Sequence, residues 1–184
     1  AFTKYKGEEI VKKYSKKFNY NYAILRYFNV AGASKSGKIG QIHSNGQLFK
    51  NLSIQFLKKK PIINVYGKNY KTKDGTCVRD YIHVSDLAEV HIKSINYLEK
   101  YKKSLTLNCG YGKGYSVNDI VMLFSKMKKN VSIIYKDRRP GDIPQVYADT
   151  RKFKKYLNWK PKYNNIKKIL VSSFNFERKI NKKN

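Results

Sequence analysis

Residues 73–90, KDGTCVRDYIHVSDLAEV, hold the sequence features that decide the fold. Arg79 and Asp80 stand side by side, and the apolar run 81–84 follows them. A Ser-Asp pair then gives a helix-start signal ahead of an amphipathic pattern, so the order predicts a loop, a short strand, an N-cap and a helix. At such a junction, packed neighbours can hold an arginine rigidly and aim it at an anion. The alternative is a local Arg79–Asp80 ion pair on the surface.

Composition limits the class of protein. Hydrophobic residues make up 41 % of the 184 and aromatic residues 14 %, which argues against disorder and allows a real core. The sequence contains no apolar run of about 18 residues, so we expect no membrane-spanning helix. The first residues, AFTKYKGEEI, are charged and do not resemble a signal peptide. Cys77 and Cys109 lack metal or disulfide spacing, which predicts reduced thiols in a cytoplasmic protein.

The net charge of +28 raises nucleic acid as an alternative partner. The basic residues are 34 lysines and only 6 arginines, spread over nearly every expected helix. Base readout favours arginine, and a binding face concentrates its charge. The composition therefore favours a protein without a specific nucleic-acid site, and a basic nucleic-acid-binding protein stays as the alternative from a different class.

Strands and helices alternate along the chain, which indicates an α/β protein. Helices are expected at 4–17, 48–57, 85–99, 116–127, 150–157 and 166–180. Strands are expected at 22–28, 62–66, 81–84, 105–109 and 131–135, with 22–28 and 105–109 buried. Ser116 and Asp119 have the spacing of a capping box. Segments 29–45, 67–76 and 137–147 are expected to be irregular, and the length of the first favours a functional loop.

Several motifs closely resemble those of one family. The pattern TxDGTxVRDYIHVxDLAxxH at 72–91, LRYFNVAGA at 25–33, RRPGDIPQVYAD at 138–149 and LNWKP at 157–161 are similar to segments of UDP-glucose 4-epimerases. These enzymes are extended short-chain dehydrogenases/reductases. Related sugar-nucleotide dehydratases and decarboxylases share the architecture but differ in the first two motifs. The resemblance therefore favours a 4-epimerase that interconverts UDP-galactose and UDP-glucose.

The resemblance implies an α/β fold that is the C-terminal part of a Rossmann-type enzyme. About 1–30 and 76–110 would supply the last strands and helices of the NAD domain, and about 31–75 and 111–184 a smaller α/β substrate-binding domain. The glycine-rich dinucleotide fingerprint does not occur in these residues, and the chain starts without methionine. We therefore expect a segment of a longer, homodimeric enzyme, inactive by itself, with no specific nucleic-acid or membrane partner.

The family's chemistry assigns two cofactor residues. In the epimerases, tightly bound NAD accepts the C4 hydride of a UDP-hexose while the tyrosine of a Y-x-x-x-K motif removes the O4 proton. The 4-keto sugar then turns about the pyrophosphate, and the hydride returns to the opposite face. TKYKGEEIV aligns with the helix of that motif, which predicts that Lys4 bonds the nicotinamide ribose and lowers the tyrosine pKa. The tyrosine itself would precede Ala1. Phe28 is predicted to contact NAD. The alternatives are an ordinary exposed helix lysine and an ordinary core phenylalanine.

The same alignment predicts a UDP-sugar site. Its residues are Asn29, Gln47, Leu48, Asn64, Val65, Tyr66, Arg79, Arg139, Asp142 and Val146. Arg79 and Arg139 are expected on the pyrophosphate, and Asp142 on the ribose hydroxyls or bracing Arg139. The alternatives are a strand end for Asn29, a plain edge strand for 64–66 and a solvated basic pair for Arg138 and Arg139.

At one position the sequence departs from the family pattern, and at another the resemblance leaves the substrate open. Lys50 replaces the proline that usually follows the substrate-contacting pair by two residues. Val146 aligns with the position that gates sugar size, and its intermediate volume leaves UDP-N-acetylglucosamine or a UDP-pentose as alternative substrates. His43, His83 and His91 lack metal-ligand spacing, so no metal is expected, and His83 is expected to be structural.

Overall fold

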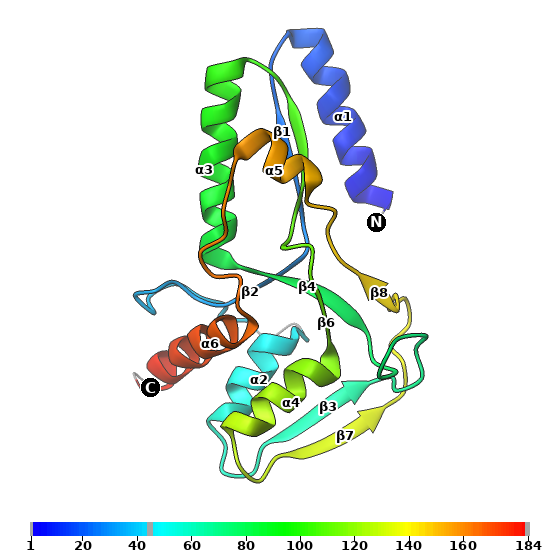
Figure 1. Ribbon diagram of the computed structural model, residues 1–184, viewed down its shortest axis with the longest axis vertical. Helices are drawn as coiled ribbons and strands as arrows, with labels where there is room; N and C mark the ends of the chain where they lie inside the picture. The colour runs from blue at the N-terminus through cyan, green and yellow to red at the C-terminus, as the bar shows by residue number, and fades with distance from the viewer. Residues whose placement is uncertain (1, 44–45, 183–184) are drawn as a thin grey trace.

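The computed structural model describes residues 2–43 and 46–182, and its elements form two regions joined by short central strands (Figure 1). The β1 region contains α1 (Phe2–Phe18), β1 (Ala23–Tyr27), α3 (Val84–Tyr101), β5 (Leu105–Cys109) and α5 (Arg151–Leu157). The β3 region contains α2 (Leu48–Phe56), β3 (Ile62–Tyr66), α4 (Val117–Met127), β7 (Ser132–Lys136) and α6 (Ile166–Asn181). Between them run β2 (Asn29–Ala31), β4 (Val78–His83), β6 (Gly114–Ser116) and β8 (Gln145–Val146).

Parallel pairing dominates the sheets. β1 pairs with β5 and β3 pairs with β7, both in parallel. β4 is the central connector, because it pairs in parallel with β2 and β8 and antiparallel with β6. Parallel strands need crossover connections, which α3 supplies after β4. The α/β class expected from the sequence is confirmed.

Each region has its own hydrophobic core. Buried residues of the β1 region are Ile82, Leu87, Val90, Leu105, Leu107, Cys109, Phe153, Leu157 and Trp159. Buried residues of the β3 region are Ala31, Phe49, Leu52, Ile63, Val65, Tyr81, Ile120, Val121, Phe124, Ile169, Leu170 and Phe174. Both cysteines are free, as expected, and both are buried; burial raises the pKa of Cys109 to about 12.

The turn at 67–76 is built by its own sequence. Gly75 has a φ of +76°, and a Cβ there would lie 2.1 Å from the backbone oxygen of Lys68, so glycine is required. The carboxylate of Asp74 accepts hydrogen bonds from the backbone N–H and hydroxyl of Thr76 and from the hydroxyl of Ser116. Burial raises the pKa of Asp74, but these hydrogen bonds outweigh it and lower the pKa overall. The turn is thereby attached to the start of α4.

The structure confirms most expected elements and corrects several details, among them strand β8 within the segment 137–147 and the start of β4 at Val78 instead of residue 81. The capping box of Ser116 and Asp119 is present. Residues 29–31 form strand β2 rather than loop, and the last part of that expected loop, 44–45, lies outside the described residues. Val84 opens α3 instead of ending the strand, because the His83 side chain caps the helix by accepting from the N–H of Ser85. β1 is half-exposed rather than buried, and β6 was not expected.

Candidate functional site

A cavity of about 460 Å³ opens between α2, β3 and β4. It lies in the β3 region. Two of the elements that line it, α2 and β3, also contribute buried side chains to the hydrophobic core of that region. Of the residues predicted for the UDP-sugar site, those that line it are Asn29, Gln47, Leu48, Asn64, Tyr66, Arg79, Arg139 and Asp142. The structure therefore brings together side chains from segments spread over more than a hundred residues of sequence.

Arg79 reaches the cavity from β4, and Asp142 holds it there. An Nη atom of Arg79 lies 3.6 Å from one carboxylate oxygen of Asp142, and the other Nη donates to the carbonyl of Val78 at 2.9 Å. The side chain of Arg79 is only 16 % exposed. A guanidinium held by two fixed partners in a cavity wall is oriented for an anionic ligand.

Arg139 approaches the same carboxylate from the segment before β8. Its Nε donates to the second oxygen of Asp142 at 3.0 Å, and its guanidinium lies 5.1 Å from the ring centre of Tyr66. Arg138 instead packs over the Tyr70 ring at 4.2 Å and donates to Asn69. The two adjacent arginines therefore have different partners, although both are exposed, Arg139 with 51 % of its side chain.

A second cavity of about 480 Å³ adjoins the first and shares Asn29, Arg79 and Asp142 with it. Phe28 and Val146 line this second cavity. Phe28 follows the last residue of β1, at the carboxyl end of a parallel pair, where α/β proteins bind ligands. Val146 is the parallel register partner of Arg79, so its side chain lies beside the arginine that enters both cavities.

Two predicted residues lie elsewhere. The side chain of Val65 is fully buried in the core of the β3 region and does not line the cavity, and its place on a strand edge along the nucleotide stays a prediction. Alternation along β3 explains this, because Asn64 and Tyr66 face the cavity and Val65 faces the opposite way. Lys4 is exposed near the start of α1 and lines neither cavity.

Asp80 and Asp86, both within residues 73–90, have structural roles. Asp80 is fully buried and accepts hydrogen bonds from the backbone N–H groups of Tyr111, Gly112 and Ala148. A surface ion pair between Arg79 and Asp80 is therefore wrong. Asp86 is also buried and accepts from the Tyr111 hydroxyl and from two backbone N–H groups at 162–163. Both carboxylates hold segments together instead of facing the cavity.

His83 is structural, as expected. It is 1 % exposed, its Nε2 lies 3.2 Å from the Ser172 hydroxyl, and its ring stacks on Tyr163 at 4.3 Å. Burial lowers the pKa of His83, against a smaller raising effect of Asp86.

Some residues that line the first cavity were not predicted from the sequence. Asn51, Gln55, Cys77 and Tyr81 also line the first cavity. The resemblance had assigned Gln47 to the site, and Asn51 and Gln55 follow it at intervals of four residues, so helical spacing from Gln47 points to the other two. Tyr81 carried no such signal, and burial raises its pKa.

Two further features concern the described residues alone. Residues 2–43 and 46–182 contain no group of three or more histidine, cysteine or acidic side chains arranged to hold a metal ion. Over the same ranges, no helix combines the length and apolar composition that a membrane-spanning segment needs.

Comparison with known proteins identifies the family of this chain. The family model described as the NAD dependent epimerase/dehydratase family matches residues 1–110. UDP-glucose 4-epimerase of Azospirillum brasilense is 41 % identical over 159 residues, which cover 85 % of this chain and 46 % of that protein.

Solved structures are similar over nearly the whole chain. UDP-glucose-4-epimerase from Stenotrophomonas maltophila, with bound NAD and formylated UDP-arabinopyranose, matches with a TM-score of 0.87 and 30 % identity over 96 % of this chain and 54 % of that one. The enzyme from Bifidobacterium longum, in complex with NAD+ and UDP, matches with a TM-score of 0.79 and 36 % identity over 94 % and 52 %. The chain thus spans about half the length of its relatives and has the Rossmann-type fold of their matching half. It belongs to the NAD dependent epimerase/dehydratase family.

Proposed function

We propose that the chain is the UDP-sugar-binding part of an NAD-dependent UDP-glucose 4-epimerase, which interconverts UDP-galactose and UDP-glucose. The observation that carries the proposal is the convergence of Arg79 and Arg139 on Asp142 in the wall of one cavity. The similarity to epimerases solved with UDP or a UDP-sugar supports it.

The cavity suits a nucleoside diphosphate. A pyrophosphate carries adjacent negative charges, and two guanidinium groups can bind it with charge-assisted hydrogen bonds worth about 1.5–3 kcal/mol each. Asp142 holds both arginines in place, and its oxygens can accept from ribose hydroxyls. Asn64, Leu48 and Tyr66 give the rest of the wall the mixed polar and apolar character that suits the uridine of the ligand.

The adjoining cavity suits the sugar and the nicotinamide end of the cofactor. NAD, when bound, supplies the hydride acceptor of the reaction. Phe28 offers an apolar surface at the carboxyl end of β1. Arg26, two residues earlier, bonds Glu8 of α1 at 2.7 and 2.6 Å, which fixes the start of that helix against β1. Lys4 lies one turn before Glu8, so its ammonium is available at the same end of β1 to bond the nicotinamide ribose and lower the pKa of a neighbouring tyrosine.

The two regions would bind different ligands. The β1 region would belong to the NAD-binding sheet, and the β3 region would bind the UDP-sugar. α5 and Trp159 pack in the β1 core, so residues 151–159 go with the first part. The exposed apolar side chains of α1 fit contact with the remainder of the enzyme or with a second subunit of a homodimer. Val146, beside Arg79, would limit the size of the sugar accepted.

The test is Arg139→Ala in the full-length enzyme. Arg139 would contact the pyrophosphate equally in ground state and transition state, and such uniform binding affects KM rather than kcat. We expect KM for UDP-galactose to rise about 10- to 100-fold, equivalent to roughly 1.4–3 kcal/mol, with kcat changed only a few-fold. Steady-state kinetics with a coupled assay measures both.

Two further variants sharpen the result. Arg139→Lys should recover only part of the loss, because an ammonium cannot make a two-pronged contact with phosphate. Arg178→Ala removes an exposed arginine of α6 and is the matched control. A KM within about twofold of the parent for Arg139→Ala would mean that this arginine is not a substrate ligand.

A further inference from the structure

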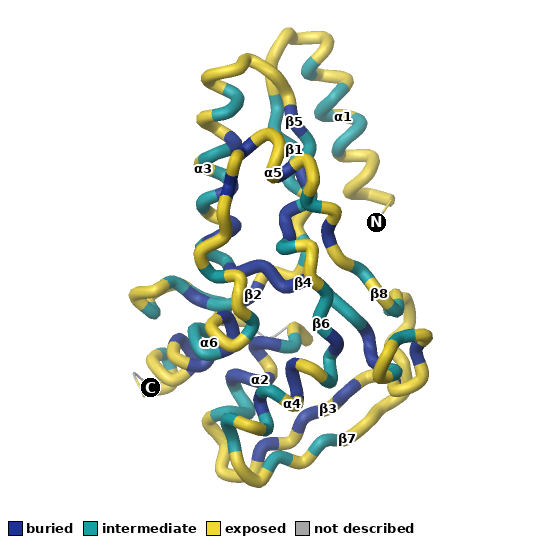
Figure 2. The backbone as a smooth tube through the Cα atoms, viewed as in Figure 1, coloured by how far each residue is buried: buried dark blue, intermediate teal, exposed yellow. Residues whose placement is uncertain are grey.

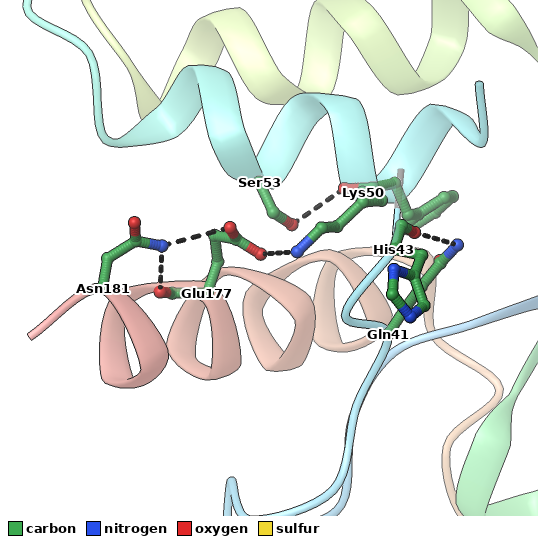
Figure 3. Close-up of polar contacts among 7 residues, drawn as sticks. Gln41, His43, Lys50, Ser53, Glu177 and Asn181 are labelled. Carbon is green, nitrogen blue, oxygen red and sulfur yellow. Dashed lines mark hydrogen bonds and ion pairs between the residues drawn. The ribbon is translucent and has the colours of Figure 1, made fainter. Parts of the chain in front are cut away.

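A buried ion pair joins the helix beside the cavity to the C-terminal helix. Lys50 of α2 and Glu177 of α6 lie with Nζ and Oε2 2.5 Å apart, and their side chains are only 5 % and 6 % exposed (Figure 3). Asn181, one turn further along α6, donates to the other carboxylate oxygen at 3.1 Å and to the backbone oxygen of Glu177 at 2.9 Å. Lys50 stands at the position where the resembled epimerases usually carry proline.

Neither charge is stable there alone. Lys50 is the third residue of α2, and the first turn of a helix disfavours a cation because the backbone N–H groups there carry partial positive charge. Burial adds a desolvation penalty for both groups, which their mutual contact and, for Glu177, the hydrogen bond from Asn181 offset. The contact between Lys50 and Glu177 therefore fixes α2 and α6 relative to each other.

α6 also holds the loop that leads to α2. The Ser172 hydroxyl accepts a hydrogen bond from the N–H of Ala33, and the Lys179 ammonium donates to the carbonyl of Ser36. At Gly40 a Cβ would lie 2.6 Å from the Phe176 ring, so loop and helix are in close contact. The strand end, the loop and the first turn of α2 are thus all attached to one helix.

The other face of α2 belongs to the binding cavity. Gln47 and Leu48, at the start of the helix, line the cavity, and so does Asn51. The N–H of Asn51 donates to the carbonyl of Gln47 at 3.0 Å, which closes the first turn. Lys50 lies in this same turn, so the ion pair acts on the segment that carries the cavity residues.

We propose that Lys50 and Glu177 are positioning residues, which fix the first turn of α2 so that Gln47 and Leu48 contact the UDP-sugar. This inference rests on the proposed function. Because the pair acts through the binding wall and not on the reacting atoms, its loss weakens substrate binding and leaves turnover nearly unchanged.

The experiment uses the full-length enzyme with Lys50→Met, Glu177→Gln and the reversed pair Lys50→Glu/Glu177→Lys. For each, KM and kcat for UDP-galactose are measured, together with hydrogen exchange of the Asn51 amide in the ligand-free protein. The single variants should raise KM about three- to tenfold with kcat within about twofold, and should speed exchange at Asn51. The reversed pair should bring both values back to within about twofold of the parent, because it restores the charge contact and suits the dipole of α2.

Lys58→Met is the matched control, because Lys58 is an exposed lysine just after α2. Single variants that melt at lower temperature while keeping the parent's KM and Asn51 exchange would show a purely stabilising pair and overturn the inference. A reversed pair as impaired as the single variants would overturn it too. A parent enzyme that fails to bind UDP in a calorimeter would refute the proposed function and, with it, the role in UDP-sugar binding. The Asn51 exchange would then still decide whether the pair orders the first turn.

Discussion

The two regions of the molecule differ in how completely they bury their helices. In the β3 region, α2, α4 and α6 each contribute buried side chains to one core. In the β1 region, the 17-residue α1 has no buried residue, and it is drawn in the colours of exposed and intermediate residues throughout (Figure 2). Ile10 is 56 % exposed and Phe18 is 59 % exposed on that helix.

This difference in helix burial indicates which contacts stabilise each region. The proposed UDP-sugar cavity rests on a closed core, so its geometry is supported from within this chain. The core of the β1 region is formed by α3, β5, α5 and the segment after it, while α1 is attached through Glu8 and Arg26. Most helical stability comes from packing of an apolar face, and α1 buries no residue against the rest of the described chain.

The largest expected effect is in the closed core. Phe124→Ala removes a fully buried ring that contacts Phe56 and Phe174 edge-on, and it should lower the free energy of unfolding by about 3–5 kcal/mol. Urea unfolding followed by circular dichroism measures the loss. A loss below about 1 kcal/mol would contradict a closed core around this ring.

A smaller effect concerns the junction between the regions, where His83 links β4 to α6. Burial lowers the pKa of His83, so the native state resists protonation at a pH where the unfolded state accepts it. Stability from this group is therefore present above the unfolded pKa of about 6.5 and is lost as the pH falls below it. We expect the melting temperature to fall between pH 7.5 and 5.5, and His83→Asn, which keeps a capping acceptor but cannot titrate, to show a weaker decline. An equal decline in both proteins would exclude His83 as a source of the pH dependence.

The smallest effect is expected on α1. Ile10→Ala removes an exposed side chain and should change the unfolding free energy of this chain by no more than about 0.5 kcal/mol. In the full-length enzyme the same substitution should cost about 2–5 kcal/mol if a partner surface covers the helix. Equal small losses in both proteins would show that this face of α1 stays exposed.

The sequence predicted most elements, because apolar periodicity and capping signals are local. It also placed Arg79, Arg139 and Asp142 in one site, through motif resemblance. Their shared carboxylate contact was only half anticipated, since Asp142 braces both arginines rather than Arg139 alone. The burial of Asp80 and Asp86 and the pairing of Lys50 with Glu177 depend on contacts between segments 25 to 127 residues apart, and no local pattern encodes such contacts. The burial of the Val65 side chain was not predicted either, because an alignment does not say which face of a strand a side chain occupies.

The central claim is that Arg79 and Arg139 bind a pyrophosphate, and one calorimetric comparison tests it most directly. The full-length parent and its Arg139→Ala variant are each titrated with UDP and, separately, with uridine. The account predicts that the substitution weakens UDP binding about 10- to 100-fold and leaves uridine binding within about twofold, because only UDP carries the phosphates that the guanidinium contacts. Unchanged UDP binding, or equal losses for UDP and uridine, would contradict it.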